Sequence, residues 1–265
     1  MLRNLFTFML AAFLVAGCAT NPVTGRKQLS LVSDDMLLQT SQQQYNQFLK
    51  ENRIVRSGSN AQMVKRVGNR IANAITRYYK QQGKADVLAG YKWEFNLVDD
   101  KQINAWCMPG GKVVVYSGLL PVSKSETGLA IVMGHEIAHA VANHSGERLS
   151  QVLLAQGLGS VTSAATSNNA RFNNIFNNVY GPAATLGVLM PNGRRQELEA
   201  DRFGMIFAAM AGYNPAEAIP FWQRMQNASK GSAKPPEFLS THPADNTRIE
   251  QIKQHLPEAR KYYRK

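Results

Sequence analysis

The chain has 265 residues, of which 44% are hydrophobic and 18% are charged. A chain of this length and composition buries a substantial core, which excludes a disordered protein and a small disulfide-stapled domain. Its 30 Lys and Arg against 18 Asp and Glu give a formal net charge of +12. This excess favours an anionic partner such as a membrane surface, lipopolysaccharide or nucleic acid, without selecting one.

The amino terminus has the pattern of an export signal. Arg3 precedes the apolar run Leu5–Val15, which is too short to span a bilayer stably. The segment Leu14-Val15-Ala16-Gly17-Cys18 resembles the lipobox of bacterial lipoproteins, in which cleavage before the cysteine leaves it carrying lipid. We therefore expect residues 1–17 to be a lipoprotein signal peptide and Cys18 to be the lipid attachment site. A plain signal peptide with an incidental cysteine is the alternative.

Lipid on Cys18 has consequences for location and for the other cysteine. The residue after Cys18 is Ala19 rather than Asp. In the lipoproteins of Gram-negative bacteria, this resembles an outer-membrane rather than an inner-membrane destination. We expect a lipid-anchored protein of the bacterial cell envelope, in the outer membrane and facing the periplasm. Cys107 then has no partner for an intrachain disulfide. A buried, inert thiol is expected there, with a reactive thiol as the alternative.

The first segment after the signal is short and irregular. Residues 18–33 are expected to form a tether between lipid and fold. From Asp34 the hydrophobic pattern is helical, and Ala61–Gln82 has apolar residues three and four positions apart, which predicts a second helix. Both helices are interpreted as packing elements.

Two short strands follow. Tyr91–Val98 has Trp and Phe at alternate positions, which is typical of a strand with one buried face. Val113–Tyr116 is β-branched and follows a turn at Pro109-Gly110-Gly111. We expect both strands in one small antiparallel sheet.

Helices are expected in most of the remaining chain. One helical stretch begins after Ser123 and runs to about His144, and another is expected from Gly146. Further helices are predicted at Arg195–Met210 and Asp245–Leu256.

The pattern predicts a mainly α protein with a small antiparallel β-sheet, an α+β fold, in a single domain over residues 34–265. The Asn-rich stretch 168–178 carries no clear period. It belongs to a segment, residues 157–194, that is expected to be a lid over the site or a plain surface insertion.

One motif carries chemistry. His135-Glu136-Ile137-Ala138-His139 matches the H-E-x-x-H zinc pattern within a predicted helix. Residues four apart share a helix face, so both imidazoles can bind one metal while the adjacent glutamate reaches a water there. We therefore expect a zinc site.

A hydrolytic zinc site needs a third protein ligand. The metzincin pattern requires a histidine where this chain has Ser145. His144 lies about 140° around an unbroken helix from His139 and is expected to point away. No Asp or Glu lies between Arg148 and Gln196.

The next carboxylates downstream of that gap lie on a predicted helix. Glu197 is the expected third ligand, since Glu147 has poor angular agreement with the two imidazoles. Asp201 shares the helix face of Glu197 and is expected to support the ligands by hydrogen bonds, with a solvated helix charge as the alternative. Glu199 is expected to point away from Glu197.

Together these residues resemble the zinc metallopeptidase family that includes the HtpX heat-shock protease, the CAAX prenyl endopeptidase, mitochondrial Oma and BepA. The chain is closest in look to the exported lipoproteins of the LoiP and YcaL type. Further matching segments are Asn104-Ala105 with Pro109-Gly110-Gly111, the strand Val113–Gly118, and Ser240-Thr241-His242-Pro243 followed by Arg248.

The resemblance implies a zincin of the gluzincin type with one Zn2+ on His135, His139 and Glu197. Glu136 would act as the catalytic base. His242 would stabilise the oxyanion, or would occupy the open metal position and keep the enzyme latent. Asp201 and Arg248 would support the ligands.

The resemblance also assigns a substrate edge. Asn104, Ala105, Gly111 and Val113 would hold an extended substrate by main-chain pairing, with broad sequence tolerance.

Three functions compete at this point. The first is a zinc endopeptidase that cleaves unfolded or misassembled envelope proteins. The second is a mostly latent chaperone or assembly factor that works with the outer-membrane assembly machinery. The third, a basic module for nucleic acid, has no supporting motif, and export argues against a nucleic acid partner.

Overall fold

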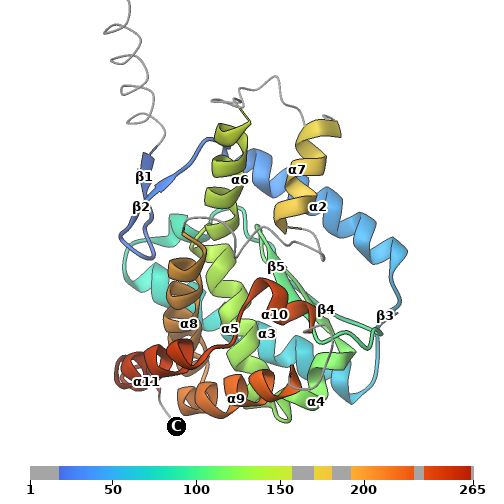
Figure 1. Ribbon diagram of the computed structural model, residues 1–265, viewed down its shortest axis with the longest axis vertical. Coiled ribbons are helices and arrows are strands. Elements are labelled where there is room, and N and C mark those ends of the chain that lie inside the picture. The colour runs from blue at the N-terminus through green and yellow to red at the C-terminus, as the bar shows by residue number, and fades with distance from the viewer. Residues whose placement is uncertain (1–17, 157–169, 181–191, 230–235, 264–265) are drawn as a thin grey trace, which may run out of the picture.

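The computed structural model describes residues 18–156, 170–180, 192–229 and 236–263. Within these ranges the chain is mostly helical and has a small β-sheet, which confirms the predicted α+β class (Figure 1). The helices are α2 (Asp34–Glu51), α3 (Ser59–Gln81), η1 (Ala85–Leu88), η2 (Ser117–Leu119), α4 (Leu120–Ser123), α5 (Glu126–Val141), α6 (His144–Ala155), α7 (Ala170–Tyr180), α8 (Gly193–Met210), η3 (Pro215–Glu217), α9 (Ala218–Ala228), α10 (Glu237–Thr241) and α11 (Asn246–Arg260).

The strands form a two-stranded ribbon and a four-stranded sheet. The ribbon joins β1 to β2, and the sheet has the order β3-β4-β6-β5. In the sheet, β3 with β4 and β5 with β6 are antiparallel, whereas β4 with β6 is parallel. The strands are β1 (Cys18–Thr20), β2 (Lys27–Leu29), β3 (Ile54–Val55), β4 (Glu94–Val98), β5 (Ala105–Met108) and β6 (Lys112–Tyr116).

The two expected strands, β4 and β6, lie in one sheet as predicted, but they pair parallel to each other, so the sheet is mixed rather than purely antiparallel. β5, which the sequence pattern does not indicate, runs opposite to both strands. The turn after β5 uses Gly110 and Gly111, both with φ near +80° (83° and 82°), a conformation that favours glycine. Because the chain reverses direction twice, β6 returns parallel to β4.

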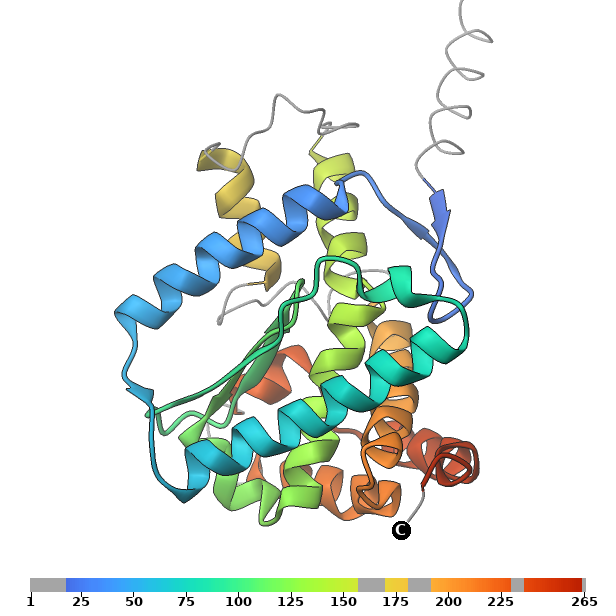
Figure 2. The same ribbon diagram turned by 180° about the vertical axis from the view of Figure 1, so that it is seen from behind.

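The two faces of the sheet are covered by different helices (Figure 2). On one face, Trp106 packs edge-on against Tyr45 and Phe48 of α2. On the other face, Phe95 and Val113 join the large core built on α3 and α5. Both faces are therefore buried.

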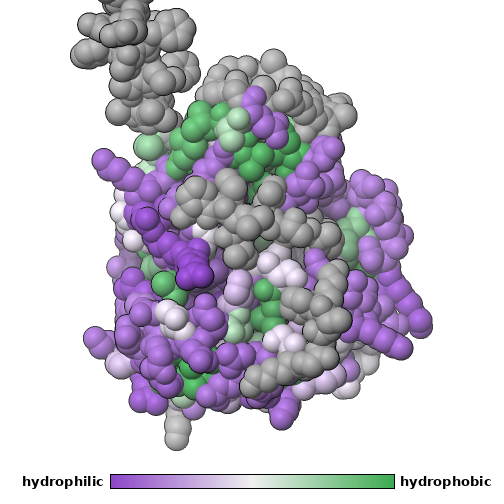
Figure 3. Space-filling view, in the orientation of Figure 1, coloured by the Kyte–Doolittle hydropathy of each residue, from purple (hydrophilic) through white to green (hydrophobic). Residues whose placement is uncertain are grey.

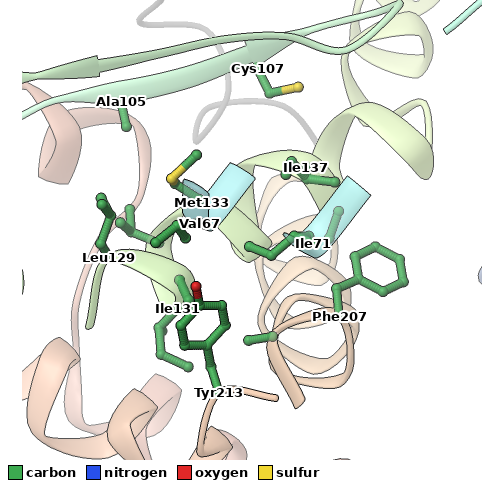
Figure 4. Close-up of a cluster of buried hydrophobic side chains, with 14 of the residues drawn as sticks. Val67, Ile71, Ala105, Cys107, Leu129, Ile131, Met133, Ile137, Phe207 and Tyr213 are labelled. Carbon is green, nitrogen blue, oxygen red and sulfur yellow. The ribbon is translucent and has the colours of Figure 1, made fainter. Parts of the chain in front are cut away.

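The central helix is α5, which lies between the sheet, α3 and α8. Ser125 begins it by accepting a hydrogen bond from the Gly128 backbone N–H. Figure 4 shows Met133 and Ile137 of α5 surrounded by side chains of α3, β5 and α8. A helix that is apolar on every side is a core helix, and α5 is buried over nearly its whole length.

The helix ends earlier than the sequence predicts. It stops at Val141, and Asn143 adopts the left-handed conformation with φ 49° before α6 begins at His144. Two helices are present, as expected, but the break between them falls at Ala142 and Asn143 rather than after His144.

A close approach joins α5 to α8. A Cβ atom on Gly204 would lie 2.7 Å from the His135 backbone nitrogen, and one on Gly134 would lie 2.6 Å from the Gly204 carbonyl oxygen. Only glycine fits at this crossing. The crossing brings the polar face of α8 against the His135 side of α5.

The Asn-rich stretch is partly helical. Phe172, Ile175 and Phe176 of α7 pack with Leu149 of α6 in a separate hydrophobic cluster. Hydrophobic surface gathers over α6 and α7 at the top of Figure 3. Residues 157–169 and 181–191 of the segment expected as a lid or insertion lie outside the described residues.

The segment expected as a tether is folded against the domain. The Asn21 side chain donates a hydrogen bond of 2.6 Å to the Ala142 carbonyl, and the Leu31 N–H donates to Ser150 Oγ. Cys18 is exposed at the start of β1, and the predicted signal peptide before it lies outside the described residues. Among the helices that the structure describes, none is long and apolar enough to cross a membrane.

Replacing Gly204 with Ala tests the crossing of α5 and α8. We expect Gly204→Ala to lower the free energy of unfolding by about 1–3 kcal/mol because the new methyl group forces the helices apart. Thermal unfolding followed by circular dichroism measures the change. Ala is a better helix former than Gly by about 1 kcal/mol, so an unchanged or raised Tm would contradict the close contact.

Candidate metal centre

Four buried side chains bring possible ligand atoms together. His135 and His139 come from α5, Glu197 from α8 and His242 from the end of α10, and one atom of each lies within 4.8 Å of the others. The first three were expected to meet, and they do. The Gly134 and Gly204 crossing sets the helix distance that allows it.

Hydrogen bonds fix the orientation of His135. Its Nδ1 lies 2.9 Å from Asp201 Oδ1. A carboxylate only accepts hydrogen bonds, so Nδ1 carries a proton, and Nε2 is the ring nitrogen left to bind a metal. The Asp201 carboxylate is held in turn by two hydrogen bonds from Arg248, of 2.6 and 2.8 Å.

A similar chain of hydrogen bonds orients His139 through His144, and the expectation that His144 points away from the site is wrong. His144 Nδ1 lies 2.9 Å from His139 Nδ1, and His144 Nε2 lies 3.0 Å from Glu199 Oε2. Glu199 accepts from His144 Nε2, so His139 Nδ1 donates to His144 and His139 Nε2 keeps its lone pair. The left-handed residue Asn143 makes this contact possible because it breaks the helix that the angular argument assumed.

The donor atoms fit a divalent cation. Two atoms bound to a tetrahedral zinc ion, each about 2.0–2.1 Å from it, lie about 3.3 Å apart. The two imidazole Nε2 atoms are 3.1 Å apart, and the Glu197 oxygens lie 3.4 Å from His135 Nε2 and 3.3 Å from His139 Nε2. Two lone pairs and a carboxylate that face one point repel one another unless a cation lies between them.

The electrostatics of the donor set support this assignment. Burial lowers the pKa of His139 well below its usual value, which keeps the imidazole neutral. Burial alone would raise the pKa of Glu197, but His242 and His139 outweigh it and hold that pKa well below its usual value. Neutral imidazoles and an ionised carboxylate are the forms that bind zinc.

Glu136 has a different environment from Glu197. Burial raises its pKa to about 7, against the opposing effect of His242. Its Oε1 is buried without a hydrogen-bond partner among the described residues, 3.9 Å from His135 Nε2 and 3.6 Å from His242 Nε2. A carboxyl group with these properties beside the ligands can take up and return a proton.

His242 lies among the ligands. Its Nδ1 is 2.8 Å from Glu197 Oε2 and 3.2 Å from His135 Nε2. Phe238 stacks on its ring at 4.6 Å, and the Phe238 N–H donates to the Ile103 carbonyl just before β5. The position of His242 therefore depends on how α10 attaches to the sheet.

Arg248 is buried and serves two groups. It holds Asp201, and its guanidinium carbon lies 3.4 Å from the centre of the Trp222 ring. Burial would lower the pKa of Arg248, but the Asp201 carboxylate outweighs this effect and raises it. The buried Asp201 carboxylate beside His135 therefore has a cationic partner.

The sheet offers only part of the expected substrate edge. β5 is one of the two outer strands of the sheet, and a small cavity of about 60 Å³ is lined by Asn104, Ala105, Glu136 and His139 among others. The Tyr116 N–H donates to the Asn104 carbonyl, so by alternation Ala105 directs its main chain to the outer edge. At this edge the Ala105 N–H donates a hydrogen bond of 2.9 Å to Oδ1 of the neighbouring Asn104 side chain.

The expectation for Gly111 and Val113 is wrong. β6 is flanked by β4 and β5, and Val113 pairs with both. The Gly111 carbonyl accepts from the Glu94 N–H, and its own N–H donates to Met108. Neither residue has main-chain groups free to bind an extended substrate.

Cys107 is buried on β5, as expected for an inert thiol. Burial raises its pKa well above the usual value, and Glu136 adds to the effect.

Residues 58–256 match peptidase family M48. The chain belongs to this family. The match confirms the resemblance drawn from the motifs.

Curated relatives agree with the family assignment. The chain is 38% identical to the mitochondrial metalloendopeptidase OMA1 of Saccharomyces cerevisiae over 183 residues, which cover 67% of this chain and 51% of that protein. It is 31% identical to OMA1 of Schizosaccharomyces pombe over 240 residues, which cover 90% and 66%. The β-barrel assembly-enhancing protease of Escherichia coli is 32% identical over 172 residues, which cover 59% and 33%.

The Asp201 contact predicts a change in metal affinity. We expect Asp201→Asn to weaken zinc binding by about 10–100-fold, because the amide cannot hold both His135 and Arg248 as the carboxylate does. Competition with a chromophoric chelator measures the dissociation constant. Asp99→Asn, at an exposed ion pair with Arg53, is the control. Equal affinity in Asp201→Asn and the unaltered protein would show that Asp201 does not support the site.

Proposed function

We propose that this M48 protein is a zinc-dependent endopeptidase of the bacterial cell envelope that cleaves unfolded or misassembled proteins. The observation that carries the proposal is the convergence of His135, His139 and Glu197 beside Glu136, whose Oε1 has no partner among the described residues. The relatives are a metalloendopeptidase and a protease, which supports the reaction class.

The chain's own residues supply the acid and base chemistry. A zinc ion held by the three ligands would act as a Lewis acid, polarising the scissile carbonyl and lowering the pKa of water. Glu136 takes the proton of the attacking water and returns it to the leaving amine. Burial raises the pKa of Glu136 toward neutrality, which suits a group that both accepts and returns a proton.

Substrate recognition falls to the outer edge of β5. A peptide laid along this edge pairs with the main chain of Ala105 and displaces the Asn104 side chain from its N–H. Main-chain pairing depends little on the side chains of the substrate, so the substrate needs only an extended conformation. Unfolded chains meet it, whereas folded proteins do not.

The location is proposed from the amino terminus. The predicted lipobox places lipid on Cys18, and Cys18 is exposed at the start of the ribbon. A protein anchored there by lipid meets envelope proteins before they fold or assemble. The excess of positive charge favours a surface rich in anionic lipid.

Replacing the proposed base tests the reaction. We expect Glu136→Gln to reduce cleavage of unfolded casein by about 10²–10⁴-fold, because the amide cannot accept a proton. Zinc content and Tm should stay unchanged. Glu250→Gln, on an exposed carboxylate of α11, should cleave casein normally. Unchanged cleavage by Glu136→Gln would overturn the mechanism.

The position of His242 favours a second candidate, a mostly latent metallopeptidase that acts as a chaperone or assembly factor for outer-membrane proteins. Its Nδ1 lies 3.2 Å from His135 Nε2 and 2.8 Å from Glu197 Oε2, close enough for all three atoms to contact one metal ion. With a metal bound, this nitrogen would occupy the position that water and substrate need. Movement of α10 away from Ile103 would then open the site.

Replacing His242 separates the two candidates. If His242 is a latch, His242→Ala raises casein cleavage several-fold because the fourth metal position becomes free for water. A fall in cleavage would instead make His242 a transition-state stabiliser and contradict latency. His255→Ala, on α11, is the control for the loss of an imidazole outside the site.

A further inference from the structure

The ribbon near the amino terminus inserts a cation between two carboxylates of the domain. Arg26 lies between β1 and β2, and its side chain is only 12% exposed. Its Nη1 and Nη2 donate to the two oxygens of Glu147 at 2.7 and 2.6 Å, and its Nε donates to Glu199 Oε1 at 2.9 Å. Such a forked, bidentate contact fixes both carboxylates in position.

One hydrogen-bond chain leads from Arg26 to a metal ligand on α5. Glu199 bonds Arg26 through Oε1 and His144 through Oε2. His144 is fully buried and bonds His139 at the ring nitrogen opposite to the metal side. Glu199 and His144 therefore each have one hydrogen-bond partner on the Arg26 side and one on the side of the metal ligand His139.

A second chain leads to the ligand on α8. Glu147 Oε2 accepts from Gln196 Nε2 at 2.7 Å, and Gln196 Oε1 accepts from Arg148 Nε at 2.6 Å. Arg148 Nη2 then lies 3.4 Å from Glu197 Oε1. The last contact is long, so the chain through Glu199 is the stronger of the two.

The ribbon itself is anchored at the point where α5 ends. Asn21 binds the Ala142 carbonyl, and its own carbonyl accepts from Gly25 while its N–H donates to the Arg26 carbonyl. The turn that presents Arg26 is thereby tied to the residue next to the break between α5 and α6. Arg26 reaches the two carboxylates from a defined position rather than from a loose tether.

We infer that Arg26 is a positioning residue for the metal site and acts on His139 through Glu199 and His144. The segment from Cys18 to Leu29 is then a structural part of the centre. Without the guanidinium, Glu199 and Glu147 lose their shared cation, Glu199 turns toward solvent, and His144 no longer holds the His139 ring. The inference rests on the metal site of the proposed function but not on peptide cleavage.

Zinc affinity of the full chain tests this inference. We expect Arg26→Ala to weaken zinc binding by about tenfold or more, measured by competition with a chromophoric chelator well below the Tm. Arg26→Lys should give a smaller loss because an ammonium keeps the charge but not the fork. Arg53→Ala, which removes an exposed partner of Asp99, should bind zinc normally.

A second variant separates positioning from folding. Glu199→Ala removes the link to His144 but leaves Arg26 its contacts with Glu147. We expect it to weaken zinc binding to a similar extent, and the double variant with Arg26→Ala to be little weaker than either single variant. The visible spectrum of the Co2+-loaded protein should change in both variants, because ligand geometry changes.

Two results would overturn the inference. One is zinc affinity in Arg26→Ala or Glu199→Ala within twofold of the unaltered protein. The other is a fully additive loss in the double variant, which would show that Arg26 does not act through Glu199. Failure of the unaltered chain to bind zinc would instead refute the metal site of the proposed function.

Discussion

The backbones of α5 and α8 lie so close at Gly134 and Gly204 that a methyl group on either residue would collide with the other helix. The metal centre depends on this crossing, because it brings Glu197 and Asp201 to the imidazoles of His135 and His139. Neither helix supplies a complete donor set. The apolar packing of α5 with α3 and the sheet holds one helix in place, and glycine allows the other to approach it.

Burial of so many charges at one centre is costly unless each is paired. Asp201 and Arg248 form a buried pair that fixes one imidazole, while Glu199 and Arg26 fix the other through His144. These contacts direct the Nε2 atoms of both imidazoles toward the same point. The arrangement is poised for a cation, whose charge offsets the repulsion among the donors.

Much of the site could be predicted because its residues recur at helical spacing on predicted helices, and because Glu197 begins the first group of carboxylates after a long gap. His144 could not, since the left-handed turn at Asn143 changes the angle on which its placement depended. β5 was missed because a strand buried on both faces, Ala105–Met108, shows no alternation. Arg26 meets its partners across more than a hundred residues, and no local pattern indicates such contacts.

The position of the metal itself tests the account most directly. Diffraction data collected from crystals of the zinc-loaded protein on both sides of the zinc absorption edge locate the ion without reference to activity. We predict one anomalous peak between His135 Nε2, His139 Nε2 and the Glu197 carboxylate, about 2.0–2.2 Å from each. A peak elsewhere, or Glu197 turned away from an ion held by the imidazoles alone, would contradict this prediction.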